Sequence, residues 1–278
     1  MRGHDSATRA TSQGLGHTFH PVNPEGIPHR SVQHPPAATA RRALLRGLAG
    51  TATLGGLALA AAPASAAPRA TASRGGTPRA AAPRPTTADG ALRELAAGNR
   101  RWRTYCERHP DETPAVRTSL TAGQQPFAVV LGCIDSRVPP ELVFDQGLGD
   151  LMTVRSAGEV LDEAVLGSVA YGVLELGIPL VMVLGHQSCG AVKAAVQADL
   201  TGERLPAHIQ YLADRISPSI DRTKTGDARV DSTVDANIRA VRSHLAAEPD
   251  LAAKISAGEL AVVGARYELT TQLVHPIA

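Results

Sequence analysis

The sequence predicts an α/β fold with a mostly parallel central β-sheet flanked by helices. Short apolar runs at 127–131, 151–155 and 180–184 have the composition of strands buried in a parallel sheet. Longer segments with helical spacing of apolar residues separate these runs. Strands that alternate with helices form a sheet covered on both faces. No internal repeat interrupts the alternation.

The N-terminal part of the chain is expected to lie outside this fold. Residues 1–40 are rich in His, Pro, Ser, Thr and Gly, which predicts disorder or residues upstream of the true start of translation. The pair Arg41-Arg42 then precedes an apolar run that closes on Pro-Ala-Ser-Ala-Ala. This order is typical of an export signal cleaved after Ala66, and the arginine pair favours the twin-arginine route.

A transmembrane anchor is the alternative to a cleaved signal. The apolar run is short, rich in Gly and Ala, and followed by a cleavage site, so export is favoured over a stable membrane anchor. The expected location is extracellular, in the cell envelope or in the periplasm. Residues 67–88 have the composition of a flexible linker. The signal segment is therefore assigned to 1–66 and the folded domain to 89–278.

Within the domain, each element has its own signal. Leu92 and Leu95 share one face of a helix expected at 91–97. Apolar residues recur every four positions from Leu161 to Val173 and predict a long helix, which the following Gly-Ile-Pro ends. The same reasoning gives the other helices and the last strand. The long helix is expected at 161–176, the other helices at 141–144, 188–199, 208–216 and 234–245, and the last strand at 260–265.

Composition excludes some classes of protein. Hydrophobic residues make up 43% of the chain and charged residues 19%, as in an ordinary soluble domain. The formal net charge of +2 argues against a nucleic-acid partner. Cysteine occurs 3 times, and only Cys106 lies outside the motifs described below, so a disulfide scaffold is not expected. Cys106 is interpreted as a half-buried small hydrophobic residue near a helix end.

Reactive side chains follow two of the predicted strands. Cys133, Asp135 and Arg137 come directly after the strand at 127–131, and His186 and Cys189 follow the strand at 180–184. Ligands of open α/β sheets bind at the carboxyl ends of the strands. If these two ends are neighbours, two thiolates and one imidazole converge, and this donor set suits zinc. Three protein ligands leave a fourth position open, as in catalytic sites.

The roles of Asp135 and Arg137 remain open at this stage. Asp135 could be the fourth zinc ligand, or it could stand beside the metal and accept a hydrogen bond from bound water. Arg137 is placed to pair with Asp135 through a bidentate fork, which would draw the carboxylate off the metal and open the site. An ordinary salt bridge is the alternative for the isolated pair.

The motifs together resemble a known family. Cys-x-Asp-x-Arg at 133–137 and His-x-x-Cys-Gly at 186–190, with Val-Arg-Ser-Ala-Gly at 154–158, are similar to the β-class carbonic anhydrases. The resemblance extends from roughly Leu92 to Tyr267. It implies reversible hydration of CO2 to bicarbonate and a proton by zinc-bound hydroxide, in a homodimer or a larger homo-oligomer.

The resemblance also implies roles for individual residues. The residues implied as zinc ligands are Cys133, His186 and Cys189, with Asp135 as a ligand only in a closed state of the site. Asp135 and Arg137 are implied as the catalytic dyad, Gln124 as a residue that orients substrate, and Tyr171 and Gly190 as part of the substrate pocket. One departure is Glu159, where the family usually carries a neutral polar residue or histidine. A carboxylate here could serve in proton transfer or could face solvent, and Glu159 is expected to face solvent.

Two other functions compete with CO2 hydration. A hydrolase of carbonyl sulfide or carbon disulfide on the same fold would keep the same ligands and dyad, so substrate access would decide between them. A non-catalytic zinc-binding protein of the cell envelope would not need Asp135 and Arg137. A thiol redox protein is not favoured, because the chain has no Cys-x-x-Cys motif.

Overall fold

The computed structural model describes residues 84–278. The expected export signal and most of the expected linker lie outside the described residues, so those assignments stay predictions. Among the described helices, none has the length and apolar character needed to cross a membrane. The described chain begins in contact with the domain, because the Arg84 guanidinium lies 3.1 Å from Asp150 and donates a 2.8 Å hydrogen bond to the carbonyl oxygen of Gln125.

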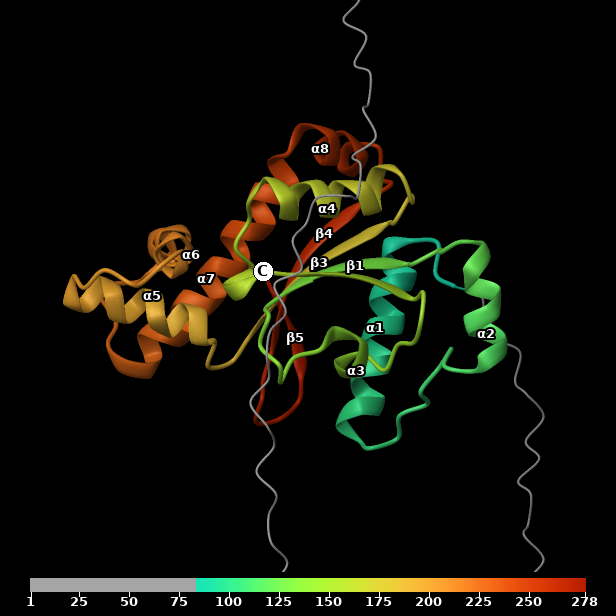
Figure 1. Ribbon diagram of the computed structural model, residues 1–278, viewed down its shortest axis with the longest axis horizontal. Coiled ribbons are helices and arrows are strands. Elements are labelled where there is room, and N and C mark those ends of the chain that lie inside the picture. The colour runs from blue at the N-terminus through green and yellow to red at the C-terminus, as the bar shows by residue number, and fades with distance from the viewer. Residues whose placement is uncertain (1–83) are drawn as a thin grey trace, which may run out of the picture. The chain divides into compact units, whose positions relative to one another are not determined.

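The core is a 5-stranded sheet with the strand order β2-β1-β3-β4-β5 (Figure 1). Neighbouring strands from β2 to β4 are parallel, and β5 pairs antiparallel with β4. The predicted fold class is confirmed. The antiparallel edge strand was not predicted, because it has only 4 residues and contains a proline, which is typical of an edge position. The strands are β1 Ala128–Gly132, β2 Leu151–Arg155, β3 Leu180–His186, β4 Ala261–Tyr267 and β5 Val274–Ile277.

Helices cover both faces of this sheet. They are α1 Ala88–Arg103, α2 Pro114–Ser119, α3 Pro140–Val143, α4 Glu163–Leu174, α5 Gly190–Thr201, α6 Ile209–Ile216, α7 Gly226–Ala247 and α8 Pro249–Ser256. Helices α2 and α8 were not predicted, and α7 was expected to begin at 234. The first turns of α7 are polar, but the buried Arg229 guanidinium donates to the carbonyl oxygens of Arg222 and Lys224 and fixes that end of the helix.

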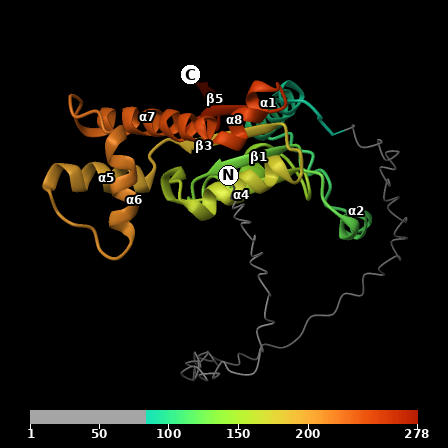
Figure 2. The same cartoon turned by 90° about the horizontal axis from the view of Figure 1, so that it is seen from above.

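Successive side chains of each strand point to opposite faces of the sheet, so the core has two layers. Val129 and Leu131 of β1 face the layer that contains α4, α5, α7 and α8. Val130 and Leu184 face the opposite layer, which contains α1 and α3. In the first layer, α7 lies along β3 and β4, and α4 lies along β1 and β2 (Figure 2). Burial of both faces explains why the central strands read as continuous apolar runs.

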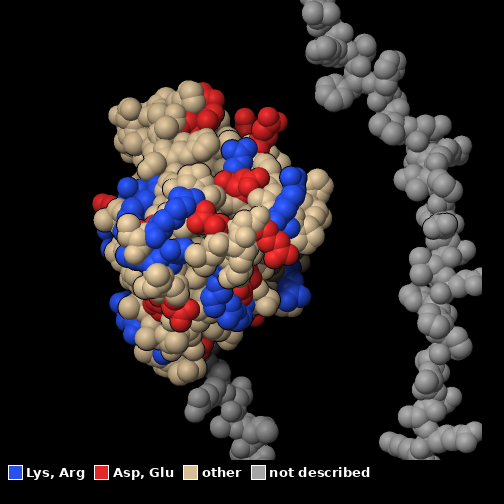
Figure 3. All heavy atoms as spheres, turned by 90° about the vertical axis from the view of Figure 1, so that its left-hand side faces the viewer, with Lys and Arg blue, Asp and Glu red and all other residues tan. Residues whose placement is uncertain are grey.

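The α5 and α6 side of the molecule is polar and mixed in charge. Basic and acidic side chains intermingle on the face seen in Figure 3. Arg222 pairs with Asp199, and Arg215 stands over the ring of Tyr211 at 5.1 Å. Exposed pairs of this kind contribute little to stability. The candidate functional residues lie at the carboxyl ends of β1 and β3, next to the start of α5.

Candidate functional site

Three potential metal ligands come from neighbouring elements. Cys133 directly follows β1, His186 is the last residue of β3, and Cys189 is the residue before α5. β1 and β3 are adjacent and parallel, with Gly132 opposite Leu184, so both strands end at the same edge of the sheet. The predicted proximity of the two strand ends is confirmed. Cys189 also stands at a helix N-terminus, where the helix dipole favours an anionic thiolate.

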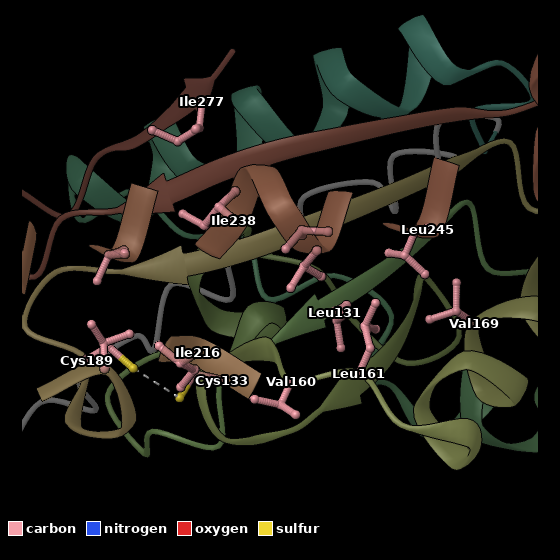
Figure 4. Packing of buried hydrophobic residues seen from close by; sticks show 14 of the residues in the cluster. Leu131, Cys133, Val160, Leu161, Val169, Cys189, Ile216, Ile238, Leu245 and Ile277 are labelled. Carbon is pink, nitrogen blue, oxygen red and sulfur yellow. Dashed lines mark hydrogen bonds between the residues drawn. The ribbon is translucent and has the colours of Figure 1, made fainter. Parts of the chain in front are cut away.

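The donor atoms of these residues converge on one point. Their ligand atoms all lie within 4.8 Å of one another, and the Sγ atoms of Cys133 and Cys189 are 3.9 Å apart (Figure 4). Two thiolates bound to one tetrahedral zinc at about 2.3 Å would stand roughly 3.8 Å apart. All three residues are buried. The cluster therefore has the separation, the donor types and the enclosure that a zinc site needs.

His186 supplies a second observation that fits a metal. Its Nε2 is buried and has no hydrogen-bond partner among the described residues. Its Nδ1 lies 2.9 Å from the backbone carbonyl oxygen of Gln187. That contact places a proton on Nδ1 and leaves the Nε2 lone pair facing the thiols, which is the usual arrangement of a metal-binding histidine. Sequence reasoning had not identified this partner for the ring.

The thiols are arranged so that one loses its proton readily. The hydrogen bond with Cys189, helped by the nearby His186 and opposed by burial, lowers the pKa of Cys133 to about 4. The same sulfur contact, together with burial, raises the pKa of Cys189. The backbone N–H of Gly158 also donates to the Cys133 sulfur at 3.4 Å. A cation would be required to hold both thiols in the ionised form.

Asp135 and Arg137 form the pair expected from their spacing. The Nη2 of Arg137 donates to Oδ2 of Asp135 at 2.7 Å, and its Nε and backbone N–H donate to Oδ1 at 2.9 Å. These bonds hold the pKa of Asp135 well below its usual range. The carboxylate is therefore ionised and engaged by Arg137, beside the three-ligand cluster. Its Oδ2 is 3.8 Å from Nε2 of His186.

Two of the residues implied as substrate contacts lie at the other end of the sheet. Gln124 is exposed and precedes the start of β1, whereas Cys133 follows its end. Tyr171 is 51% exposed near the end of α4. Its neighbour Gly172 packs against Met152 near the start of β2. Within a single chain, neither Gln124 nor Tyr171 lies near the three potential metal ligands.

Gly190 is the residue implied for the substrate pocket that does lie at the site. It begins α5 directly after Cys189. A Cβ placed at Gly190 would have no atom within 4 Å, so the space beside this position is open.

Arg155 contacts the site loop, although sequence reasoning gave it no role. It ends β2 opposite Gly132. Its Nε donates to the carbonyl oxygen of Cys133 and its Nη2 to that of Asp135, each at 2.7 Å. The one feature of the sequence that could have identified Arg155 was its position at the end of the strand next to β1. Its partners are backbone atoms, which a sequence pattern does not reveal.

The expectation that Glu159 faces solvent was wrong. Its side chain is 2% exposed, and its Oε1 has no hydrogen-bond partner within residues 84–278. Burial, and then the neighbouring charge of Cys133, raise its pKa well above the usual value. The turn at Ala157–Glu159 directs the side chain inward, because Gly158 and Glu159 both have positive φ. The sequence did not show this change of direction.

Cys106 was expected to be half-buried, and it is exposed instead. Its neighbour Tyr105 has a φ of 54°, in the turn that follows α1. Cys106 therefore has no part in the metal cluster.

The family model described as carbonic anhydrase matches residues 128–274. Carbonic anhydrase 2 of Mycobacterium tuberculosis is 42% identical over 181 residues, which cover 64% of this chain and 87% of that protein. A Coccomyxa β-carbonic anhydrase has a TM-score of 0.54 at 25% identity, covering 67% of this chain and 86% of that one. Tetrameric β-carbonic anhydrases of Sordaria macrospora share the fold, with a TM-score of 0.55 at 20% identity and coverage of 67% and 96%.

Proposed function

The chain belongs to the β-class carbonic anhydrases, and we propose that it hydrates carbon dioxide with a zinc ion held by Cys133, His186 and Cys189. The observation that carries the zinc assignment is the convergence of two thiols with an unpartnered imidazole nitrogen. Zinc held by three protein ligands would act as a Lewis acid and lower the pKa of water to about 7.

The residues around this centre have distinct tasks in the proposal. The Asp135 carboxylate is ionised and offers Oδ2 as a hydrogen-bond acceptor to the attacking water, which orients the water lone pair toward CO2. Arg137 holds the carboxylate in that orientation through three hydrogen bonds. The carbonyl of Gln187 fixes the ring of His186. The proton released in the reaction must then leave for solvent.

The competing functions are not favoured. Hydrolases of carbonyl sulfide or carbon disulfide would use the same ligands, but the similar curated proteins are named carbonic anhydrases. A zinc-storage protein would not need a carboxylate that is oriented beside the metal by a charged partner.

A stopped-flow assay of CO2 hydration on zinc-loaded protein tests the proposal. We expect turnover that disappears after chelation and returns with zinc. Zinc-loaded protein that is inactive above pH 8 would overturn the assignment. Carbonyl sulfide and carbon disulfide offered to the same preparation would reveal the alternative activity.

Assembly into a homodimer or larger homo-oligomer is part of the proposal. Gln124 and Tyr171 lie at the end of the sheet opposite Cys133, so only a second subunit can bring them to the site. Ile134, which lies between Cys133 and Asp135, is 61% exposed. An exposed apolar side chain at this position suits an interface that closes over the site.

Export is the last part of the proposal. Arg41-Arg42, the apolar run and the Ala-x-Ala ending support a twin-arginine signal cleaved after Ala66. That route carries proteins after they fold, so the thiols would enter an oxidising compartment already bound to metal. Replacing both arginines with lysine is expected to retain the protein inside the cell. N-terminal sequencing of the exported protein should begin at Ala67.

A further inference from the structure

The guanidinium of Arg155 bridges two carbonyl groups of the loop that carries Cys133 and Asp135. Arg155 is the last residue of β2 and lies opposite Gly132 at the end of β1. Its Nε donates to the Cys133 carbonyl oxygen at 2.7 Å, and its Nη2 donates to the Asp135 carbonyl oxygen at 2.7 Å. One planar group thus spans the backbone from the metal ligand to the catalytic carboxylate.

This contact is distinct from the pairing of Asp135 with Arg137. Arg137 holds the carboxylate of Asp135, whereas Arg155 holds its backbone. Within residues 84–278, no carboxylate lies within ion-pair distance of Arg155. Its charged donors are directed at the loop, and hydrogen bonds from charged donors are stronger than neutral ones.

The loop has few other constraints on its backbone. The Asp135 carbonyl oxygen also accepts from Val138 N–H at 3.1 Å, and Ser156 N–H donates to the Gly132 oxygen at 3.1 Å. Ile134, between the two bridged carbonyls, is 61% exposed and contributes little packing. Rotation of this segment would move the Cys133 sulfur and the Asp135 carboxylate together, because both side chains leave it.

We propose that Arg155 is a positioning residue for the hydration reaction. Its guanidinium holds the loop so that the Asp135 carboxylate and the Cys133 thiol are correctly placed relative to His186. The inference rests on the proposed function. It extends that function from the side chains that touch the metal and water to the group that orients their backbone. The rigid, two-pronged shape of the guanidinium is what the task needs, since a lysine ammonium cannot span both carbonyls with fixed geometry.

The test compares Arg155→Lys and Arg155→Ala with Arg204→Ala, a control at an exposed loop arginine. Zinc affinity is measured by competition with a chelator, and kcat and KM for CO2 are measured at saturating zinc. For both Arg155 variants we expect kcat to fall by about 10- to 100-fold, zinc affinity to fall by about tenfold and KM to change less than about twofold. Added guanidinium ion should restore part of the kcat of Arg155→Ala.

Thermal unfolding of the zinc-loaded variants separates positioning from folding. The inference holds if Arg155→Lys unfolds near the wild-type temperature and still loses kcat. It is overturned if kcat stays within about twofold of wild type, or if both variants fail to fold, because Arg155 would then act through stability. Inactive wild-type protein with zinc bound would instead refute the proposed function. Wild-type activity together with unaffected variants would refute this inference alone.

Discussion

The Oδ2 of Asp135 lies 3.8 Å from the Nε2 of His186 while its carboxylate is held by Arg137. Asp135 thus connects the two parts of the site, because it pairs with Arg137 and lies beside the metal ligand His186. The distance places the carboxylate beside the ligand cluster, where it can contact a water in the fourth position.

Asp135→Asn should remove most of the turnover and leave zinc bound. An amide cannot hold the charged pairing with Arg137, and its NH2 group cannot accept the hydrogen of the attacking water. We expect kcat to fall at least about 100-fold with zinc content near one per chain. Stopped-flow hydration and atomic emission spectrometry measure the two quantities.

Asp199→Asn is the matched control, because Asp199 also pairs with an arginine, Arg222, and its side chain is 16% exposed, close to the 17% of Asp135. It should leave kcat unchanged. Zinc loss from Asp135→Asn would show that Asp135 is an obligatory ligand, contrary to this prediction.

Cys189→Ser should abolish zinc binding, whereas Cys106→Ser should not. A serine hydroxyl stays protonated at neutral pH and is a poor ligand for zinc, and Cys189 is buried in the cluster. Cys106 is exposed and outside it. Zinc stoichiometry after dialysis gives the comparison, and full zinc retention by Cys189→Ser would contradict the ligand set.

Gly158→Ala should destabilise the protein more than Gly202→Ala. Both glycines have positive φ, at 64° and 70°, but only the new Cβ at position 158 would collide, at 2.8 Å from Ile216 Cδ1. We expect a loss of about 3 kcal/mol for Gly158→Ala and about 1 kcal/mol for Gly202→Ala in the free energy of unfolding. Urea titration of zinc-loaded protein checks this, and equal losses would show that the packing at Gly158 relaxes.

Asp150→Asn should gain stability relative to wild type as the pH rises. Burial raises the pKa of Asp150 to about 6 from 3.8, against the opposing effect of Arg84. The folded state therefore binds the proton more tightly than the unfolded state. Its stabilisation is complete below about pH 3.8 and is lost as the pH rises through 6.

The difference of about two pH units corresponds to roughly 3 kcal/mol, which the asparagine variant would not lose between pH 4 and pH 7. Urea unfolding of wild type and variant across this range measures the difference. Gly202→Ala adds no titrating group and should differ from wild type by a constant amount. A loss of relative stability by Asp150→Asn at pH 7 would show that the ion pair with Arg84 outweighs burial.

Mixing Gln124→Ala with Asp135→Asn subunits should restore activity that neither variant has alone. If Gln124 acts on the site of its partner, random dimers recover about a quarter of the wild-type sites, because half of them are mixed and each mixed dimer has one intact site. Hydration rates before and after unfolding and refolding the mixture provide the measurement. Activity that stays at the level of the separate variants would mean that Gln124 does not act across subunits.

Much of the fold was predictable because the central strands are buried on both faces. β2 was predicted with its observed bounds, and β1 and β3 differed only at their ends. β5 was missed because four residues at a sheet edge give no periodic signal, and the start of α7 was missed because its polar residues bond to backbone atoms. The spacing of apolar residues in a segment indicates which of its faces is buried. This signal is weak where burial is partial or where buried polar groups form hydrogen bonds inside the protein.

The sequence by itself determined the chemistry of this protein. The types and spacing of Cys133, Asp135, Arg137, His186 and Cys189 predicted both the zinc-suited donor set and the ion pair beside it. Tertiary structure alone decided which other groups join them. It turned the Glu159 carboxyl inward, placed the Arg155 guanidinium on the carbonyls of the loop, and left Gln124 at the far end of the sheet. The physical reason is that these contacts depend on turn conformation and on backbone partners, neither of which leaves a residue pattern in the chain.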